Sequence, residues 1–330
     1  MPASVPASSS PPHHLVIAHA GHSAPAIRDT LASLKLPNLE RLLARLQLAH
    51  DDAQDDESSL SPPHERALAA ALGLPVADGL IPWAARQARE LGLPPAPAGQ
   101  GWGLMTLCHW QVGIDDVALG DPGMLHIAEG ESAALLDAVR PFFDEDGIAV
   151  HPTPQPGRWL ARSALFDGLP TASIDRAAGY PISEWSPQGE AARPLRRLQN
   201  EMQMLLYTHP VNDARAERGV PAINSFWLSG TGALPANVAA DTADVAYDDS
   251  LRAATARADA AAWAQAWQAL DAQRLAPLLA DAQRGAPVRL TLCGNRAARS
   301  FTAREGGGLA SMARRLFERT PSAAEVLGTL

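Results

Sequence analysis

Residues 195–232 read LRRLQNEMQMLLYTHPVNDARAERGVPAINSFWLSGTG, and they combine a helical pattern, a turn and a strand pattern. Apolar side chains recur at helical spacing between positions 195 and 206, which predicts an amphipathic helix. Pro210 lacks a backbone N–H and disfavours a helical conformation at the residue before it. We therefore expect this helix to end near Thr208.

A second, shorter helix is expected directly after this turn. Asn212 or Asp213 can cap its first turn, and Gly219 can end it in a left-handed conformation. Positions 223–228 are then mostly apolar and aromatic, which predicts a short buried strand followed by a glycine turn.

Polar side chains that can hold an anion or a phosphorylated ligand gather in the same stretch. They are His209, Asn212, Arg215, Asn224 and Ser229. An arginine can bind a phosphate or carboxylate with two parallel hydrogen bonds. The alternative for Arg215 is an arginine on the helix surface, and the alternative for His209 is a packed histidine. The sequence leaves both open.

Helices alternate with short apolar strands in the rest of the chain. A strand pattern at 15–18 precedes a helix pattern at 37–48, and a helical region at 248–276 precedes a strand pattern at 287–292. This alternation is typical of an α/β fold with a layered sheet flanked by helices. The expected organisation is a disordered tail at 1–12, an α/β core at 13–101 and 166–330, and a smaller α+β insertion at 102–165.

Charge and composition exclude several functional classes. The net charge is −9, the pI is about 5.5, and Lys35 is the only lysine, so direct nucleic-acid binding is not expected. Apolar runs stay below the roughly 18 residues that span a bilayer, and the N-terminal segment lacks the features of a signal peptide. Cys108 and Cys293 lie far apart, which suits a reducing compartment. We therefore expect a cytoplasmic protein without membrane partners.

A second group of candidate residues follows the first predicted strand, where α/β folds place their sites. His19, His22 and Ser23 are the candidates for a catalytic role. His19 and His22, together with His109, are the candidates for binding a metal ion. The alternative is that these histidines are structural or face solvent.

Several motifs resemble a known family. The run His-Pro-Val-Asn at 209–212 is followed by Arg215, Gly219, Trp227 and Gly-Thr-Gly at 230–232. Shorter pieces of the same resemblance lie at 37–42, 142–147 and 158–159. This set is similar to cofactor-independent phosphoglycerate mutases of the archaeal type. It is still more similar to bacterial RpfE-type regulatory proteins, over roughly residues 13–300.

The resemblance implies an alkaline-phosphatase-like core. Active members of that superfamily hold two metal ions with Asp and His at strand ends and use a Ser nucleophile. This sequence departs from that pattern, because His19 stands where the family has a metal-binding Asp and no histidine follows His209. The strand predicted at 287–292 ends in Cys293-Gly294-Asn295 instead of an acid and a histidine.

We therefore expect a phosphoglycerate mutase-like protein that has lost the two-metal site, a regulatory or ligand-binding pseudoenzyme with no cofactor. The expected partners are a phosphorylated or carboxylate small molecule and a protein. One alternative is an active phosphotransferase or mutase-type enzyme that uses a divalent metal. Its rearranged site would consist of His19, His22, Ser23, His109 and His209. Another is an interaction scaffold whose eight tryptophans include an exposed docking patch.

Overall fold

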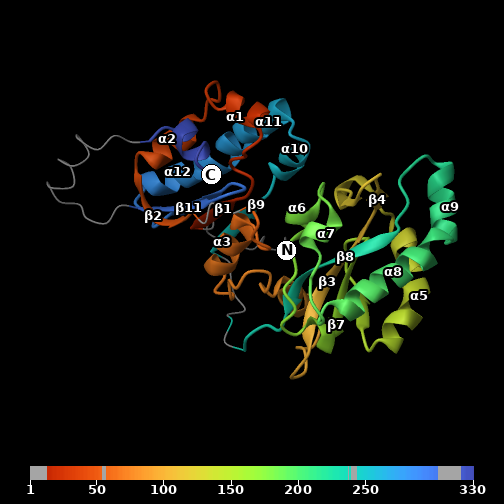
Figure 1. Cartoon of the computed structure of the whole chain (residues 1–330). Helices are drawn as coiled ribbons and strands as arrows, with labels where there is room; N and C mark the ends of the chain where they lie inside the picture. The colour runs from red at the N-terminus through yellow and green to blue at the C-terminus, as the bar shows by residue number, and fades with distance from the viewer. Residues whose placement is uncertain (1–12, 54–56, 237, 239–243, 304–320) are drawn as a thin grey trace, which may run out of the picture. The chain divides into compact units, whose positions relative to one another are not determined.

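The structure is a computed structural model, and it describes residues 13–53, 57–236, 238, 244–303 and 321–330. The chain is a mixed α/β protein that divides into two compact units (Figure 1). Unit 1 comprises Met1–Glu57, Pro63–Leu72 and Ala239–Leu330, and unit 2 comprises Ser58–Pro62 and Gly73–Val238. Each unit has its own sheet and its own hydrophobic core.

The sheet of unit 1 has five strands in the order β2-β11-β10-β1-β9. The strands are β1 (His14–Ile17), β2 (Leu46–Asp52), β9 (Val245–Asp248), β10 (Arg289–Cys293) and β11 (Ala298–Ala303). β1 runs parallel to both β9 and β10, whereas β11 is antiparallel to β10 and β2. The carboxyl ends of β1, β9 and β10 therefore meet at one edge of the sheet.

Helices cover both faces of this sheet (Figure 1). They are α1 (Pro25–Thr30), α2 (Pro37–Leu43), α3 (Pro63–Ala71), α10 (Arg252–Ala256), α11 (Ala260–Leu270), α12 (Ala276–Gln283) and α14 (Ala323–Leu327). Successive side chains of a strand point to opposite faces. Leu15 and Ile17 accordingly pack in the cluster formed by α1, α2, α11 and α12, whereas Val16 packs against α3.

Unit 2 is built on an antiparallel sheet of four strands in the order β6-β7-β3-β8. The strands are β3 (Gly101–Cys108), β6 (Ala149–Pro152), β7 (Arg158–Ser163) and β8 (Ser225–Gly232). One core cluster joins this sheet to α5 (Glu129–Glu145) and α8 (Arg193–Tyr207), and another joins it to α4 (Trp83–Glu90). Unit 2 also contains the hairpin of β4 (Trp110–Val112) and β5 (Val117–Leu119), the α-helices α6 (Ile174–Ala177), α7 (Ile182–Trp185) and α9 (Pro210–Glu217), and the short 3-10 helices η1 (Pro122–Met124) and η2 (Ala164–Phe166).

The bounds of the units differ from the expected core and insertion. Segment 102–165 is only part of unit 2, because β8 pairs with β3 and brings the stretch 195–232 into the same unit. The expected core segments 13–101 and 166–330 are therefore each divided between the two units. The expected tail at 1–12 lies outside the described residues.

Two helix predictions in unit 1 were too long. The helix predicted at 37–48 ends at Leu43, and Leu46 begins β2, which pairs with β11. The helical region predicted from 248 begins only at α10, because β9 extends to Asp248 as a parallel partner of β1. In both cases a pairing between segments distant in sequence overrides the local helical pattern.

Candidate functional site

The candidate site of unit 1 lies where β1 and β10 end side by side. The loop after β1 carries the predicted residues His19, His22 and Ser23, and the loop after β10 carries Asn295. In open α/β sheets such carboxyl ends are the usual place for a ligand.

Two glycines let the segment around α14 approach these loops closely. A Cβ atom at Gly21 would overlap the carbonyl oxygen of Leu327, and one at Gly294 would overlap the carbonyl oxygen of Leu330. Any larger residue at either position would push this segment away from the strand ends.

A cavity of about 250 Å³ lies at this edge of unit 1. The polar side chains that line it are His22, Ser23, Arg28, Asn295, Arg296 and Thr329. Residues 327–330 supply the rest of its wall. The sequence predicted His22 and Ser23 but missed the two arginines, which flank the predicted loops without a recognisable motif.

Hydrogen bonds join the two loops beside the cavity. The Asn295 side-chain amide donates to Ser23 Oγ at 3.0 Å and to a carboxylate oxygen of Glu57 at 2.7 Å. Glu57 also lies 3.9 Å from the Arg296 guanidinium, so it offsets part of that charge. Arg28 makes no ion pair within the described part of the chain and contributes its positive charge to the cavity lining.

His22 is held as a neutral imidazole. Its Nδ1 accepts a hydrogen bond from the backbone N–H of Ala24 at 3.0 Å. Burial lowers the pKa of His22 and outweighs the opposing effect of the Glu57 carboxylate, and the neighbouring His19 makes a smaller contribution that also lowers it. At neutral pH the ring therefore offers hydrogen-bonding groups without a full positive charge.

His19 adopts an unusual backbone conformation, with φ of 56°. The indole N–H of Trp263 donates to the His19 carbonyl oxygen at 3.2 Å, and that of Trp267 donates to the Ala20 carbonyl oxygen at 3.2 Å. The His19 ring lies 4.7 Å from the ring of His64, which belongs to α3. No sequence spacing links these two histidines, so His64 was not predicted.

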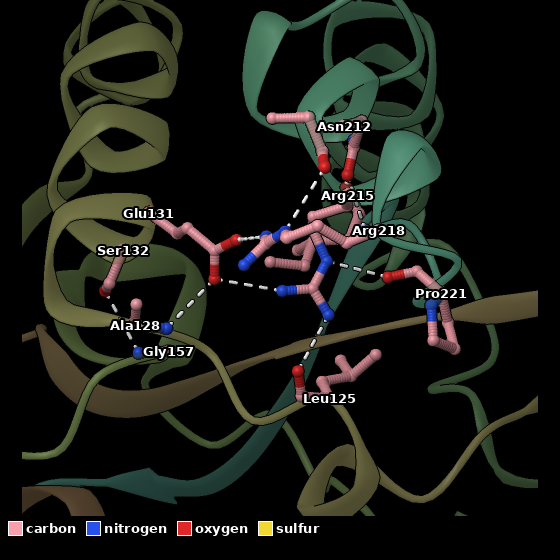
Figure 2. Close-up of polar contacts among 11 residues, drawn as sticks. Leu125, Ala128, Glu131, Ser132, Gly157, Asn212, Arg215, Arg218 and Pro221 are labelled. Carbon is pink, nitrogen blue, oxygen red and sulfur yellow. Dashed lines mark hydrogen bonds and ion pairs between the residues drawn. The ribbon is translucent and has the colours of Figure 1, made fainter.

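The stretch 195–232 lies in unit 2, and Arg215 is its most buried charged group. Its side chain is 1% exposed. The guanidinium donates to the carbonyl oxygens of Pro221 and Leu125 at 2.7 Å each and to the Glu131 carboxylate at 2.9 Å (Figure 2). Arg218 is bonded to the other oxygen of Glu131. The guanidinium of Arg215, which was predicted to bind an anion, thus binds groups of the protein itself.

Glu131, which the sequence analysis missed, is the acidic centre of this cluster (Figure 2). Desolvation alone would raise its pKa. The hydrogen bond from the backbone N–H of Ala128 and the charges of Arg218 and Arg215 outweigh desolvation and hold the pKa of Glu131 below its usual range. The carboxylate therefore stays ionised at neutral pH and ties α5 to α9.

Asn212 and His209 have structural roles in the same region. The Asn212 amide donates to the carbonyl oxygens of Leu206 and Ile223, and its oxygen accepts from the Ile223 N–H, each at 2.8 Å. The His209 ring accepts from the backbone N–H of Val211 and caps α9. The predicted caps Asn212 and Asp213 are therefore wrong, whereas Gly219 has the predicted left-handed conformation, with φ of 67°.

Two of the remaining candidates of unit 2, Asn224 and His109, also contact backbone. Asn224 bonds both backbone groups of Trp110, with its oxygen 2.7 Å from the N–H and its amide 3.0 Å from the carbonyl. Ser229 is a buried residue of β8, and the His109 Nδ1 lies 2.8 Å from the Ala222 carbonyl oxygen. His109 and His209 belong to unit 2, whereas His19 and His22 belong to unit 1.

The tryptophans do not form the exposed docking patch of the scaffold hypothesis. All eight lie within the described residues, and six are buried. Trp83 and Trp185 are half-buried. The scaffold hypothesis, as far as it relied on exposed tryptophans, is wrong.

The chain is similar in sequence to two phosphoglycerate mutases. It is 28% identical over 119 residues to a "probable 2,3-bisphosphoglycerate-independent phosphoglycerate mutase" of Geobacter sulfurreducens. It is 28% identical over 122 residues to a 2,3-bisphosphoglycerate-independent phosphoglycerate mutase of Methanothrix thermoacetophila. These matches cover 36% and 37% of this chain and 30% and 29% of the relatives, so they span less than a third of either relative. No family model matches the chain.

Two solved structures align with most of the chain, but at low similarity. The cofactor-independent phosphoglycerate mutase of Thermoplasma acidophilum aligns with a TM-score of 0.37 and the PH0037 protein of Pyrococcus horikoshii with 0.42, each at 14% identity. The alignments cover 90% and 89% of this chain and 91% and 87% of those chains. The sequence comparisons thus give weak similarity to phosphoglycerate mutases of the cofactor-independent type.

No described helix is both long and apolar enough to cross a membrane.

Proposed function

We propose that this protein is a phosphoglycerate mutase-like ligand-binding protein without two-metal catalysis, which binds a small phosphorylated or carboxylate anion in the cavity of unit 1. The resemblance to RpfE-type proteins supports a regulatory role in a bacterial cytoplasm, with a protein partner that responds to the bound anion. The proposal rests on the hydrogen-bond donors and arginines that line the cavity.

The cavity lining favours anions. Arg28 and Arg296 contribute positive charge, and Ser23 and Asn295 contribute hydrogen-bonding groups. No carboxylate side chain is present among the described residues that line it. A phosphate or carboxylate would gain charge-assisted hydrogen bonds from an arginine, whereas a divalent cation would be repelled.

The loops after β1 and β10 carry no carboxylate, which supports the absence of the two-metal centre that the family resemblance implies. Such a centre needs several carboxylates and imidazoles, and the loop after β10 supplies Asn295 and Arg296 instead. Asp248 ends β9, but its carboxylate accepts from Ser250 and lies 3.4 Å from the Arg274 guanidinium. We therefore derive no phosphoryl transfer through paired metal ions.

The cavity has room for a small metabolite. A volume of about 250 Å³ holds roughly eight water molecules at about 30 Å³ each. A three-carbon acid with one phosphate group is of this size, so we propose this chemical class for the anion.

The proposal is tested by thermal unfolding of the full chain in EDTA with 3-phosphoglycerate. A ligand at about 100 times its Kd adds about 2.7 kcal/mol, which should raise the unfolding temperature by roughly 5–10 °C. Arg28→Ala should abolish the shift, whereas Arg41→Ala, an exposed arginine of α2, should retain it. An equal shift in both variants, or no shift with any three-carbon phosphorylated acid, would refute this site.

The alternative of an active enzyme makes a different prediction. Mutase or phosphatase turnover in the presence of added divalent metal that His19→Ala abolishes would establish the rearranged histidine site. We expect no such turnover, because the cavity offers no arrangement of carboxylates for the reaction among its described residues.

A further inference from the structure

We propose that His19 and His64 of unit 1 form a binding site for one divalent transition-metal ion. The two ring centroids are 4.7 Å apart, and a ring nitrogen of each lies within 4.8 Å of one of the other. This pair is separate from the residues that line the anion cavity, so the inference goes beyond the proposed function.

The backbone of His19 supports a functional role for its ring. A φ of 56° is rare for a residue other than glycine, and such conformations persist only where the surroundings impose them. Here the indoles of Trp263 and Trp267 hold the carbonyl oxygens of His19 and Ala20. Residues kept in this region cluster at ligand-binding and active sites.

The partner ring comes from a rigid element. His64 lies in the first turn of α3 and is 4% exposed, and α3 packs on β1 and β10. The position of the His64 ring is therefore fixed relative to the strand that ends before His19. Such pre-positioned side chains reduce the ordering cost of binding an ion.

The ligand chemistry selects the class of ion. Neutral imidazole suits zinc, copper and nickel, whereas magnesium, calcium and manganese prefer oxygen ligands. Two imidazoles leave coordination positions that water or a bound anion can fill. This is one ion on two histidines, in contrast to the pair of ions held by Asp and His that the family resemblance implies.

The test compares Zn²⁺ affinity in variants of the EDTA-treated full chain, measured by competition with a chromophoric chelator. His19→Asn removes the imidazole with a residue that tolerates positive φ, and His64→Gln removes the other. Each should weaken the tightest binding event by more than about tenfold, since even the loss of groups that only orient metal ligands costs 10–100-fold. His109→Gln in unit 2 should leave this event unchanged.

Two results would overturn the inference. One is that the His19→Asn/His64→Gln double variant, folded by circular dichroism, binds Zn²⁺ as tightly as the wild type through other histidines of the chain. The other is that His22→Gln, rather than His64→Gln, abolishes binding, which would place the ion on the loop after β1. Anion binding is measured in EDTA, so its failure is distinguishable from failure of the metal site.

Discussion

Arg215→Ala should destabilise unit 2 in the absence of any ligand, because the structure makes Arg215 a support for backbone rather than an anion clamp. The guanidinium joins α9 to the Leu125 carbonyl oxygen, the Pro221 carbonyl oxygen and the Glu131 carboxylate (Figure 2). The opposite hypothesis, a ligand-binding arginine, predicts little change in stability and a loss of ligand affinity.

The size of the effect depends on which hydrogen-bond partners of Arg215 would remain buried without another hydrogen bond. The hydrogen bond to Leu125 is buried, so its carbonyl oxygen would be left unsatisfied at a cost of about 1–3 kcal/mol. Pro221 is exposed and water can replace its bond. Glu131 keeps Arg218 and the Ala128 N–H. With the packing lost by a side chain that is 1% exposed, we expect about 3 kcal/mol, the lower end for breaking a buried ion pair.

Arg218→Ala is the matched control. Arg218 contacts the same carboxylate, but its side chain is 55% exposed, so its removal should cost no more than about 1 kcal/mol. Urea unfolding monitored by circular dichroism gives the two values, and amide hydrogen exchange should locate the loss in α5 and α9. Equal stability of the two variants, combined with lost anion binding in Arg215→Ala alone, would refute the structural role.

Two further predictions concern ionisable groups. The pKa of Glu131 is lowered in the folded state, so its stabilisation is present above the unfolded carboxyl pKa of about 4.3 and is lost as pH falls through the folded value. The stability difference between wild type and Glu131→Gln should thus be constant above about pH 6 and shrink below about pH 4; a difference that persists in strong acid would contradict this. Burial raises the pKa of both Cys108 and Cys293, so neither thiol should react with iodoacetamide until the chain unfolds, and rapid alkylation of the native protein would contradict the structure.

Local patterns predicted those elements whose formation depends on nearby residues. The spacing of apolar residues located α8, and Pro210 located the break before α9, because helix periodicity and proline geometry act within a few residues. The strands β9 and β11 were missed, and the start of β2 was read as helix. Each is defined by pairing with β1, β2, β10 or β11, and no local signal reports which distant strands will meet.

The polar residues of the motif were harder to interpret for the same reason. Asn212 and Arg215 have the chemistry of ligand contacts, and sequence alone does not show that the chain after α9 folds back to offer carbonyl oxygens at Ile223 and Pro221. The loop after β1 was found, since a strand end is a recognisable place for a site. His64 and Arg28, which lie near this loop, belong to the helices α3 and α1, and no sequence motif predicts that they lie there.

The motif that carries the family resemblance and the candidate sites lie in different units of the chain. The motif at 209–232 that carries it lies in unit 2, where its polar side chains hold α9, β8 and the preceding loop together. The cavity and the imidazole pair lie in unit 1, at strand ends whose residues depart from the family pattern. Because the motif residues contact groups of unit 2, they carry no information about the chemistry of unit 1. The motif therefore has a packing role in unit 2, and the ligand and metal measurements on unit 1 test its binding chemistry separately.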